Sequence, residues 1–217
     1  MKKLVVLLLA TAMVLSCVAC GNGGTTNTEN KENTENTENV TNTEDNTQQT
    51  GEIADAADLL VKVWDEYKEV GSDDVQFSIG GGDAANMVMD APGKYDVTTE
   101  GGLDGLVFQY CVPETAIEKA DDFATGIHMM MANNFTTVGL HVTDAADVES
   151  VVADIKDATL NNQWMCGMPE RFIVVTVNEN YVIAAFGIEM IIDVYEEAIT
   201  NVYGDAAVIV VDEMLVR

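Results

Sequence analysis

The chain has 217 residues, of which 37 are Asp or Glu and 10 are Lys or Arg, so its formal net charge is −27. Proteins that bind nucleic acids use Lys and Arg to neutralise phosphates, and this balance argues against a nucleic-acid partner. Hydrophobic residues make up 47% of the chain, which is typical of sequences that fold. The composition therefore indicates a folded and strongly acidic protein.

The first twenty residues have the features of a lipoprotein export signal. Two lysines precede an apolar stretch, residues 4–15, which suits a signal peptide but is short for a membrane span. The following residues, Ser16-Cys17-Val18-Ala19-Cys20-Gly21, resemble the lipobox of bacterial lipoproteins. We predict lipidation at Cys20, with Cys17 as the alternative lipidation site and an ordinary secretory signal as the remaining alternative. Acyl chains at Cys20 would anchor an extracellular domain to the outer face of the cytoplasmic membrane.

The composition changes abruptly after the lipobox. Residues 21–51 are rich in Asn, Thr and Glu and have no apolar periodicity, so they are predicted to form a disordered tether. Residues 52–217 contain the remaining apolar periodicity and are predicted to form one domain.

The folded part is predicted to contain two copies of a strand, strand, helix pattern after an amphipathic helix at 52–69. The first copy has strands at 126–132 and 135–142, a two-residue turn at Asn133-Asn134 and a helix at 145–160. In this hairpin, Ile127, Met129 and Met131 share the core face with Val138, Leu140 and Val142, while Thr137 lies on the other face. The remaining expected elements are an apolar element at 103–112, a helix at 113–123, strands at 172–177 and 181–186, a helix at 188–202 and a strand at 207–211.

These elements predict an α+β fold. The antiparallel sheet is built from the two strand-strand-helix units, with their helices on one face. Both faces of the second hairpin are apolar, which predicts that the N-terminal amphipathic helix packs against its second face.

Four segments carry a resemblance to a known family. The segments are Asp90-Ala91-Pro92-Gly93-Lys94-Tyr95-Asp96, Ile127-His128-Met129-Met130, Asn161-Asn162-Gln163-Trp164-Met165-Cys166-Gly167-Met168-Pro169 and Tyr181-Val182-Ile183-Ala184-Ala185-Phe186-Gly187. They resemble a domain-of-unknown-function family found in lipoproteins of Gram-positive bacteria of the clostridial type, some members of which are labelled bacteriocin transport accessory proteins. The resemblance spans about residues 59–203, implies an anchored α+β domain and supplies no catalytic residues.

Two cysteines lie outside the signal, and the sequence leaves open whether Cys111 and Cys166 are free or bridged. The segment that begins at Trp164 and contains Cys166 weakly resembles the Trp-Cys-Gly-Pro-Cys motif of thioredoxin-like proteins. It lacks the second Cys, and a strand is expected to follow it instead of a helix. A buried structural Cys166 is therefore the favoured interpretation.

The other candidates for chemistry are also few. His128 and His141 are expected on one face of the hairpin, but no further ligand stands at zinc spacing, so no metal site and no cofactor are predicted. Gly80-Gly81-Gly82-Asp83 lacks the Lys-Ser/Thr of a phosphate loop and is read as a turn. The run Met129-Met130-Met131 is read as core, with a pliable binding surface as the alternative.

The sequence therefore favours a lipid-anchored domain without enzymatic activity that binds a partner at the cell envelope. Its acidity favours a cationic peptide or an envelope protein as that partner, although charge that only keeps the domain dispersed is the alternative interpretation. A thiol–disulfide accessory protein for peptide export, with Cys166 and Trp164 at its site, is the alternative function.

Overall fold

The computed structural model describes residues 52–215, which lie within one compact unit. The predicted signal, the predicted lipidation site Cys20 with its alternative Cys17, and the predicted tether lie outside the described residues. Within residues 52–215, none of the helices combines the length and the apolar character needed to cross a membrane.

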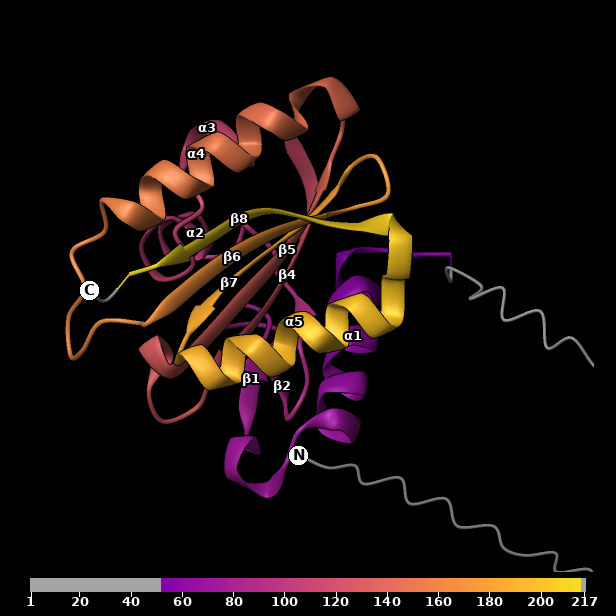
Figure 1. Cartoon of the computed structure of the whole chain (residues 1–217). Helices are drawn as coiled ribbons and strands as arrows, with labels where there is room; N and C mark the ends of the chain where they lie inside the picture. The colour runs from indigo at the N-terminus through magenta and orange to yellow at the C-terminus, as the bar shows by residue number, and fades with distance from the viewer. Residues whose placement is uncertain (1–51, 216–217) are drawn as a thin grey trace, which may run out of the picture. The chain divides into compact units, whose positions relative to one another are not determined.

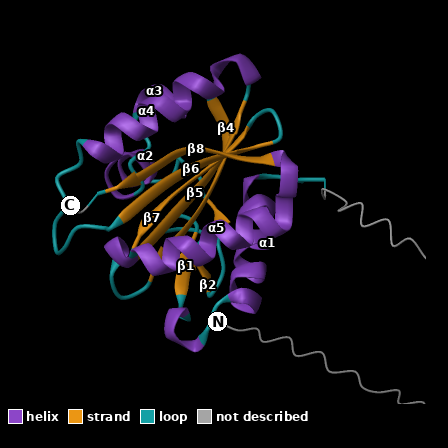
Figure 2. Cartoon of the chain, viewed as in Figure 1, coloured by secondary structure: helices purple, strands orange, loops and turns teal. Residues whose placement is uncertain are grey.

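The fold is α+β, as predicted, and is built on an eight-stranded antiparallel sheet (Figure 1; Figure 2). The strand order is β2-β1-β4-β5-β7-β6-β8, and β3 pairs with β4 beside β1. The strands are β1 (Ile79–Gly81), β2 (Val88–Met89), β3 (Gly93–Lys94), β4 (Ala120–His128), β5 (Phe135–Val142), β6 (Arg171–Val177), β7 (Tyr181–Gly187) and β8 (Ala207–Met214). The helices are α1 (Ala56–Val70), α2 (Gly102–Gln109), α3 (Glu114–Ile117), α4 (Val148–Leu160) and α5 (Glu189–Tyr203), with short 3-10 turns at 73–75, 132–134, 145–147 and 204–206.

Helices cover both faces of this sheet, each with its own core (Figure 1). On one face, α1 and α5 pack on residues of β6 and β7 such as Ile173 and Ile183. On the other face, α2, α3 and α4 cover residues such as Leu140 and Val174. The prediction that both unit helices share one face is therefore wrong, since α4 and α5 lie on opposite faces. The apolar residues on both faces of β6 require this arrangement, because either face left bare would expose a row of aliphatic side chains.

The helix α1 forms where the periodicity predicts it. Asp55 begins it, because its Oδ1 accepts a hydrogen bond from the amide of Asp58 at 2.8 Å. Its buried residues recur every three or four positions, which places them on one stripe against the sheet. These buried residues are Ala56, Leu59, Leu60, Val63, Trp64 and Tyr67.

The first hairpin differs from its prediction in register. The turn is not the pair Asn133-Asn134, because β4 ends at His128 and a longer connection, residues 129–134, leads to β5. Ile127 therefore lies opposite Thr136, whereas a turn at 133–134 would place it opposite Leu140. The difference is four residues, an even number, so Ile127 still shares a face with Val138 and Leu140. Met129 and Met131 instead lie in the connection, so their predicted core positions are wrong.

The helix predicted at 113–123 is also shorter than expected. It forms one turn, α3, after which the chain enters β4 at Ala120. Phe123 then packs against the sheet face covered by α4, opposite Leu140. Ala and Asp have low strand propensity, so the sequence here gave no strand signal and tertiary pairing determines the structure.

Thr137 lies on the second face of the first hairpin, and this face is also buried. It was expected outside the core, but it is 1% exposed, and its Oγ1 lies 3.0 Å from the hydroxyl of Tyr195 and 3.2 Å from the carbonyl oxygen of Ala184. The helix α5 covers this face, so the hydroxyl is buried and hydrogen-bonded.

We expect Thr137→Val to lower the free energy of unfolding by about 1–3 kcal/mol, because it leaves the buried Tyr195 hydroxyl without this partner while keeping the volume. Thr137→Ser keeps the hydroxyl and should cost less than Thr137→Val. Urea denaturation measures both variants. Equal stability of wild type and Thr137→Val would contradict this account of the contact.

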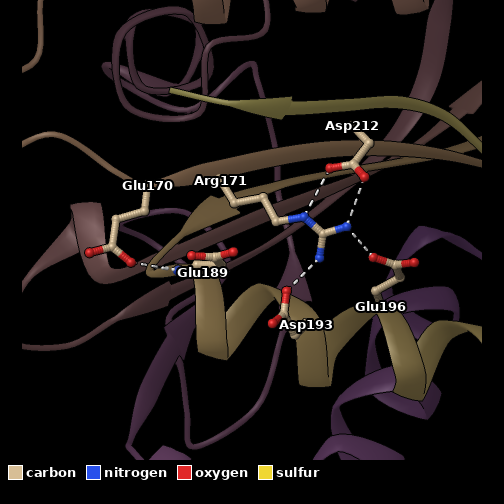
Figure 3. A network of polar contacts seen from close by, with 6 residues as sticks. All are labelled: Glu170, Arg171, Glu189, Asp193, Glu196 and Asp212. Carbon is tan, nitrogen blue, oxygen red and sulfur yellow. Dashed lines mark hydrogen bonds and ion pairs between the residues drawn. The ribbon is translucent and has the colours of Figure 1, made fainter. Parts of the chain in front are cut away.

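An arginine at the start of β6 ties the sheet to α5 and β8 (Figure 3). Arg171 Nε and Nη2 donate to the two carboxylate oxygens of Asp212 at 2.9 and 3.0 Å, and Nη1 donates to Asp193 Oδ1 at 2.7 Å. Nη2 also donates to Glu196. Only 11% of the Arg171 side chain is exposed, so one enclosed guanidinium holds three carboxylates from two elements.

Candidate functional site

The nine methionines of the described residues all lie on the surface. Each is at least 45% exposed, and Met130 reaches 90%. Methionine is a common core residue, so its complete absence from both cores requires an explanation. The nine are Met87, Met89, Met129, Met130, Met131, Met165, Met168, Met190 and Met214.

The strand register places these methionines at one end of the sheet. The strands β4, β7 and β8 end there, and β5 and β6 begin there, as the antiparallel pairing requires. The short strands β1 and β2 also lie at this end, because β1 pairs with the last residues of β4. We call the nine methionines together with the exposed Phe108 the methionine rim.

Two connections at the centre of the rim are held together by one amide. Asn133 Nδ2 donates to the carbonyl oxygens of Met165 and Gly167 at 2.8 and 2.7 Å. Asn134 continues the link, because its carbonyl oxygen accepts a hydrogen bond from the amide of Ile188 at the start of α5. The connections 129–134 and 161–170 therefore form one surface with the first turn of α5.

His128 fixes the first of these connections. Its Nδ1 accepts hydrogen bonds from the amides of Met130 and Met131 at 3.1 and 3.2 Å, and its ring stacks on Phe77 with 4.8 Å between centroids. Burial lowers the pKa of His128 below its ordinary value, which favours the neutral ring that can accept at Nδ1. His128 is therefore a positioning residue for the rim.

Acidification should release this connection. Because the folded-state pKa of His128 is lowered, its contribution is present above the unfolded value of about 6.5 and is lost as the pH falls through the lowered value. We expect the NMR signals of the Met130 and Met131 amides to shift between about pH 7 and pH 5. The amide of Ala146, which is bonded to Asp144, serves as a control in the same spectra. A His128→Gln variant that keeps the same transition would contradict the assignment.

Two cavities adjoin the rim on either side of the C-terminal end of α2. The first, of about 280 Å³, is lined by glycines of β1 and α2, by Tyr95 and Tyr110, and by Met87 and Met129. The second, of about 270 Å³, is lined by Phe108, Trp164 and Met165 among others. Gln109 lines both cavities, so they are neighbours. Each is of a size to hold single apolar side chains.

The run Gly80-Gly81-Gly82-Asp83 forms part of the first cavity. Gly80 and Gly81 belong to β1, and the predicted turn begins at Gly82, whose φ is +82°. A Cβ at Gly81 would lie 2.2 Å from the backbone nitrogen of Gly93, so the backbones approach too closely for any side chain there. Asp83 is buried, and burial would raise its pKa, but hydrogen bonds from Asn86, Asp96 and Ala85 lower it. Its carboxylate is thus used to hold the turn.

The structure separates the two predicted histidines. His141 lies opposite Asp122, six residues along β4 from His128, which corresponds to about 20 Å. His141 Nδ1 lies 2.6 Å from Asp121 Oδ1, and its Nε2 lies 2.7 Å from Asn180 Nδ2. The two histidines are therefore too far apart to share an ion, and residues 52–215 contain no group of three His, Cys, Asp or Glu side chains placed to hold a metal.

The two cysteines of the domain are free. Cys111 is buried, burial raises its pKa to about 11, and its Sγ lies 3.3 Å from Asn162 Nδ2. Cys166 is exposed in the connection before β6, so the interpretation as a buried residue is wrong for it. Trp164 packs edge-on against Phe186, with 4.8 Å between centroids, and its role is therefore packing beside the rim. Thiol–disulfide exchange by a cysteine pair gains no support from this arrangement.

Comparisons with models of protein families, with curated proteins and with solved structures found no match. The methionine rim, the charge of the domain and the sequence of the N-terminus are therefore the features that bear on function.

Proposed function

We propose that this protein is a non-enzymatic docking domain, held to the outer face of the cytoplasmic membrane by lipid on Cys20, whose methionine rim binds cationic amphipathic segments of polypeptides at the cell envelope. The observation that carries the proposal is the exposure of every described methionine at one end of the sheet. Thioether side chains are flexible and polarisable, so a surface made of them adapts to apolar side chains of different shapes.

The charge of the domain favours a cationic partner. Residues 52–215 contain 31 acidic and six basic residues, a net charge of −25. Each of the six bases is already in an ion pair with a carboxylate. The unpaired charge is therefore acidic, and its field raises the local concentration of basic ligands while it repels anionic ones.

The two cavities beside the rim supply anchoring positions. An amphipathic helix presents apolar side chains at i, i+3, i+4 and i+7, and such anchors dock into apolar grooves in known helix-in-groove complexes. Phe108 and Met165 on one side of Gln109, and Met87 and Met129 on the other, offer apolar walls to two successive anchors. Basic residues on the opposite helix face would remain in the negative field.

The binding experiment uses the chain from Asn46 to Arg217, because this compact unit contains both cores complete. The probe is an 18-residue helical peptide of Leu and Lys with one apolar face. A peptide of the same composition, rearranged to have no apolar face, is the control for charge. We expect saturable binding of the first peptide in 0.15 M salt and at least tenfold weaker binding of the second.

Variants of the domain locate the binding surface. The triple change Met129→Gln, Met130→Gln and Met131→Gln should weaken binding about tenfold, since it makes the centre of the rim polar. A matched triple change of three exposed residues on β8, Val208→Gln, Ile209→Gln and Val210→Gln, should leave the affinity unchanged. Equal binding of both peptides, or equal loss in both triple variants, would refute docking at the rim.

The anchor is tested separately in growing cells. Radiolabelled fatty acid should appear on the protein and be absent from a Cys20→Ala variant. Label that persists in Cys20→Ala and disappears only in Cys17→Ala would assign the lipid to Cys17 instead. The absence of label from the wild-type protein would leave an ordinary secretory signal and refute the anchor.

A further inference from the structure

The strand β8 forms an open apolar edge of the sheet. It is the last strand in the order and pairs only with β6 among the described strands. Its first five residues, Ala207–Val211, carry no charge, and Val208, Ile209 and Val210 are 54%, 42% and 44% exposed. Edge strands of monomeric proteins are usually protected by Lys, Pro or a covering element, so a bare apolar edge is an interaction surface.

The hydrogen-bond alternation shows which backbone groups this edge offers. The amide of Asn178 donates to the carbonyl oxygen of Ala206 at 3.0 Å, which makes Val177 and Ala207 a non-hydrogen-bonded pair. The next pair, Thr176 with Val208, is then hydrogen-bonded, and Val175 with Ile209 is not. The N–H and C=O groups of Ala207 and Ile209 therefore point away from β6. The N–H of Ala207 already donates to the carbonyl oxygen of Gly204, so the edge offers the carbonyl of Ala207 and both groups of Ile209 to a strand that would be added there.

A groove lies between α4 and the last two strands of the sheet, β6 and β8. Its volume is about 530 Å³, and it is lined by Val148, Val152 and Ala153 of α4, by Val210 and Val211 of β8, and by Thr176 of β6 with the turn that follows it. A strand edge beside a helix is the arrangement in which peptides bind by strand addition, because the edge supplies backbone hydrogen bonds and the helix supplies apolar contacts for alternate side chains.

The charges at the groove select a basic ligand. Glu149 and Glu179 line it and are exposed, and neither forms an ion pair with the six described bases. The lining base Lys156 is held at 2.7 Å by Glu213. A second copy of residues 52–215 would bring another net charge of −25 to the edge, so self-pairing is electrostatically opposed.

We infer that β8 and α4 form a second binding site, separate from the methionine rim, that takes an extended peptide segment as an added strand, with apolar and basic residues on the peptide face turned toward α4. Because alternate side chains of a strand point to opposite faces, both kinds of side chain come from this one face, where Val152, Ala153, Glu149 and Glu179 line the groove. The carbonyl of Ala207 and both the N–H and the carbonyl of Ile209 supply the backbone hydrogen bonds.

The test uses a capped eight-residue peptide, Val-Thr-Lys-Thr-Val-Thr-Lys-Thr, whose Val and Lys side chains share one face, with the chain from Asn46 to Arg217. We expect saturable binding in 0.15 M salt and slower hydrogen exchange at the Ile209 amide when the peptide is bound. A peptide of the same sequence, N-methylated at alternate residues on the side that faces β8, should bind at least tenfold more weakly, because it cannot donate to the edge.

Three variants separate this site from its alternatives. Ile209→Pro removes an outward N–H and should reduce the affinity for the peptide at least tenfold. Ala153→Lys, at an exposed position, should also reduce this affinity, because it repels the basic peptide without affecting the fold. The rim triple Gln variant should bind this peptide normally, whatever the result for the rim. Equal binding of the N-methylated and the unmethylated peptide would overturn the inference. A dimer found by sedimentation would also overturn it, if Ile209→Pro dissociates that dimer and if the dimer does not bind the peptide.

Discussion

Phe135→Ala is expected to lower the free energy of unfolding by about 3–5 kcal/mol, because it empties the centre of the core under α1 and α5. Phe135 is 0% exposed, and its ring lies 5.0 Å from that of Tyr195 and 5.4 Å from that of Phe77. Trp64 and Tyr67 complete the cluster, at 5.8 and 6.4 Å. The ring therefore joins β5 to both helices of this face.

The matched control is Phe108→Ala, which removes the same side chain at a position that is 76% exposed. It should change the stability by no more than about 0.5 kcal/mol. Thermal and urea unfolding of both variants give the comparison. Similar small losses for Phe135→Ala and Phe108→Ala would contradict the assignment of Phe135 to the core.

Arg171→Met is the second change with a large expected effect, a loss of about 2–4 kcal/mol. The substitution keeps much of the apolar stem but removes the cation that three carboxylates share. Hydrogen bonding to Asp212, and further to Glu196, raises the pKa of Arg171 despite its burial, so the guanidinium is charged at every accessible pH. Asp193 and Asp212 are about half exposed, which places the loss below that of a fully buried pair.

Two comparisons test the geometry of this network. Arg171→Lys keeps the charge but cannot bind Asp212 with two parallel bonds, so it should recover only part of the lost stability. Lys156→Met breaks an exposed pair with Glu213 and should cost less than about 1 kcal/mol. The loss in Arg171→Met should shrink in high salt, since the three remaining carboxylates repel each other less. A loss in Arg171→Met no larger than that in Lys156→Met would show that the network adds no stability.

The long elements of this fold could be predicted because their apolar residues repeat at the period of a helix or a strand. The buried stripe of α1 and the two-sided apolar pattern of β6 are both explicit in the sequence. The short strands β1 to β3 could not be predicted, since two or three residues around Gly80 or Gly93 carry no period. The sequence pattern does not predict the exposure of Met129. The observed hairpin register differs from the predicted one by four residues, which leaves Ile127 on the same face of the sheet but places Met129 in the connection after β4.

The Arg171 network had no local signal. Its carboxylates come from positions 22, 25 and 41 residues further along the chain, which only tertiary structure brings together. The rim has a compositional signal, nine methionines in one acidic domain, but the pattern of the predicted hairpin favours core positions for the run Met129-Met130-Met131. The exposure of the methionines can be recognised only from the strand pairing, which places the ends of five strands at the same end of the sheet.

The position of the methionines also determines how the domain responds to oxidants. Peroxide converts a thioether to a sulfoxide, which is polar and chiral, and solvent-exposed sulfur reacts first. None of the described methionines contributes to either core, so sulfoxide formation would leave the packing of the sheet and helices intact. The rim alone would change from apolar to polar, and reductases that act on methionine sulfoxide would restore it. Chemical damage and loss of structure are thereby separated within one small domain.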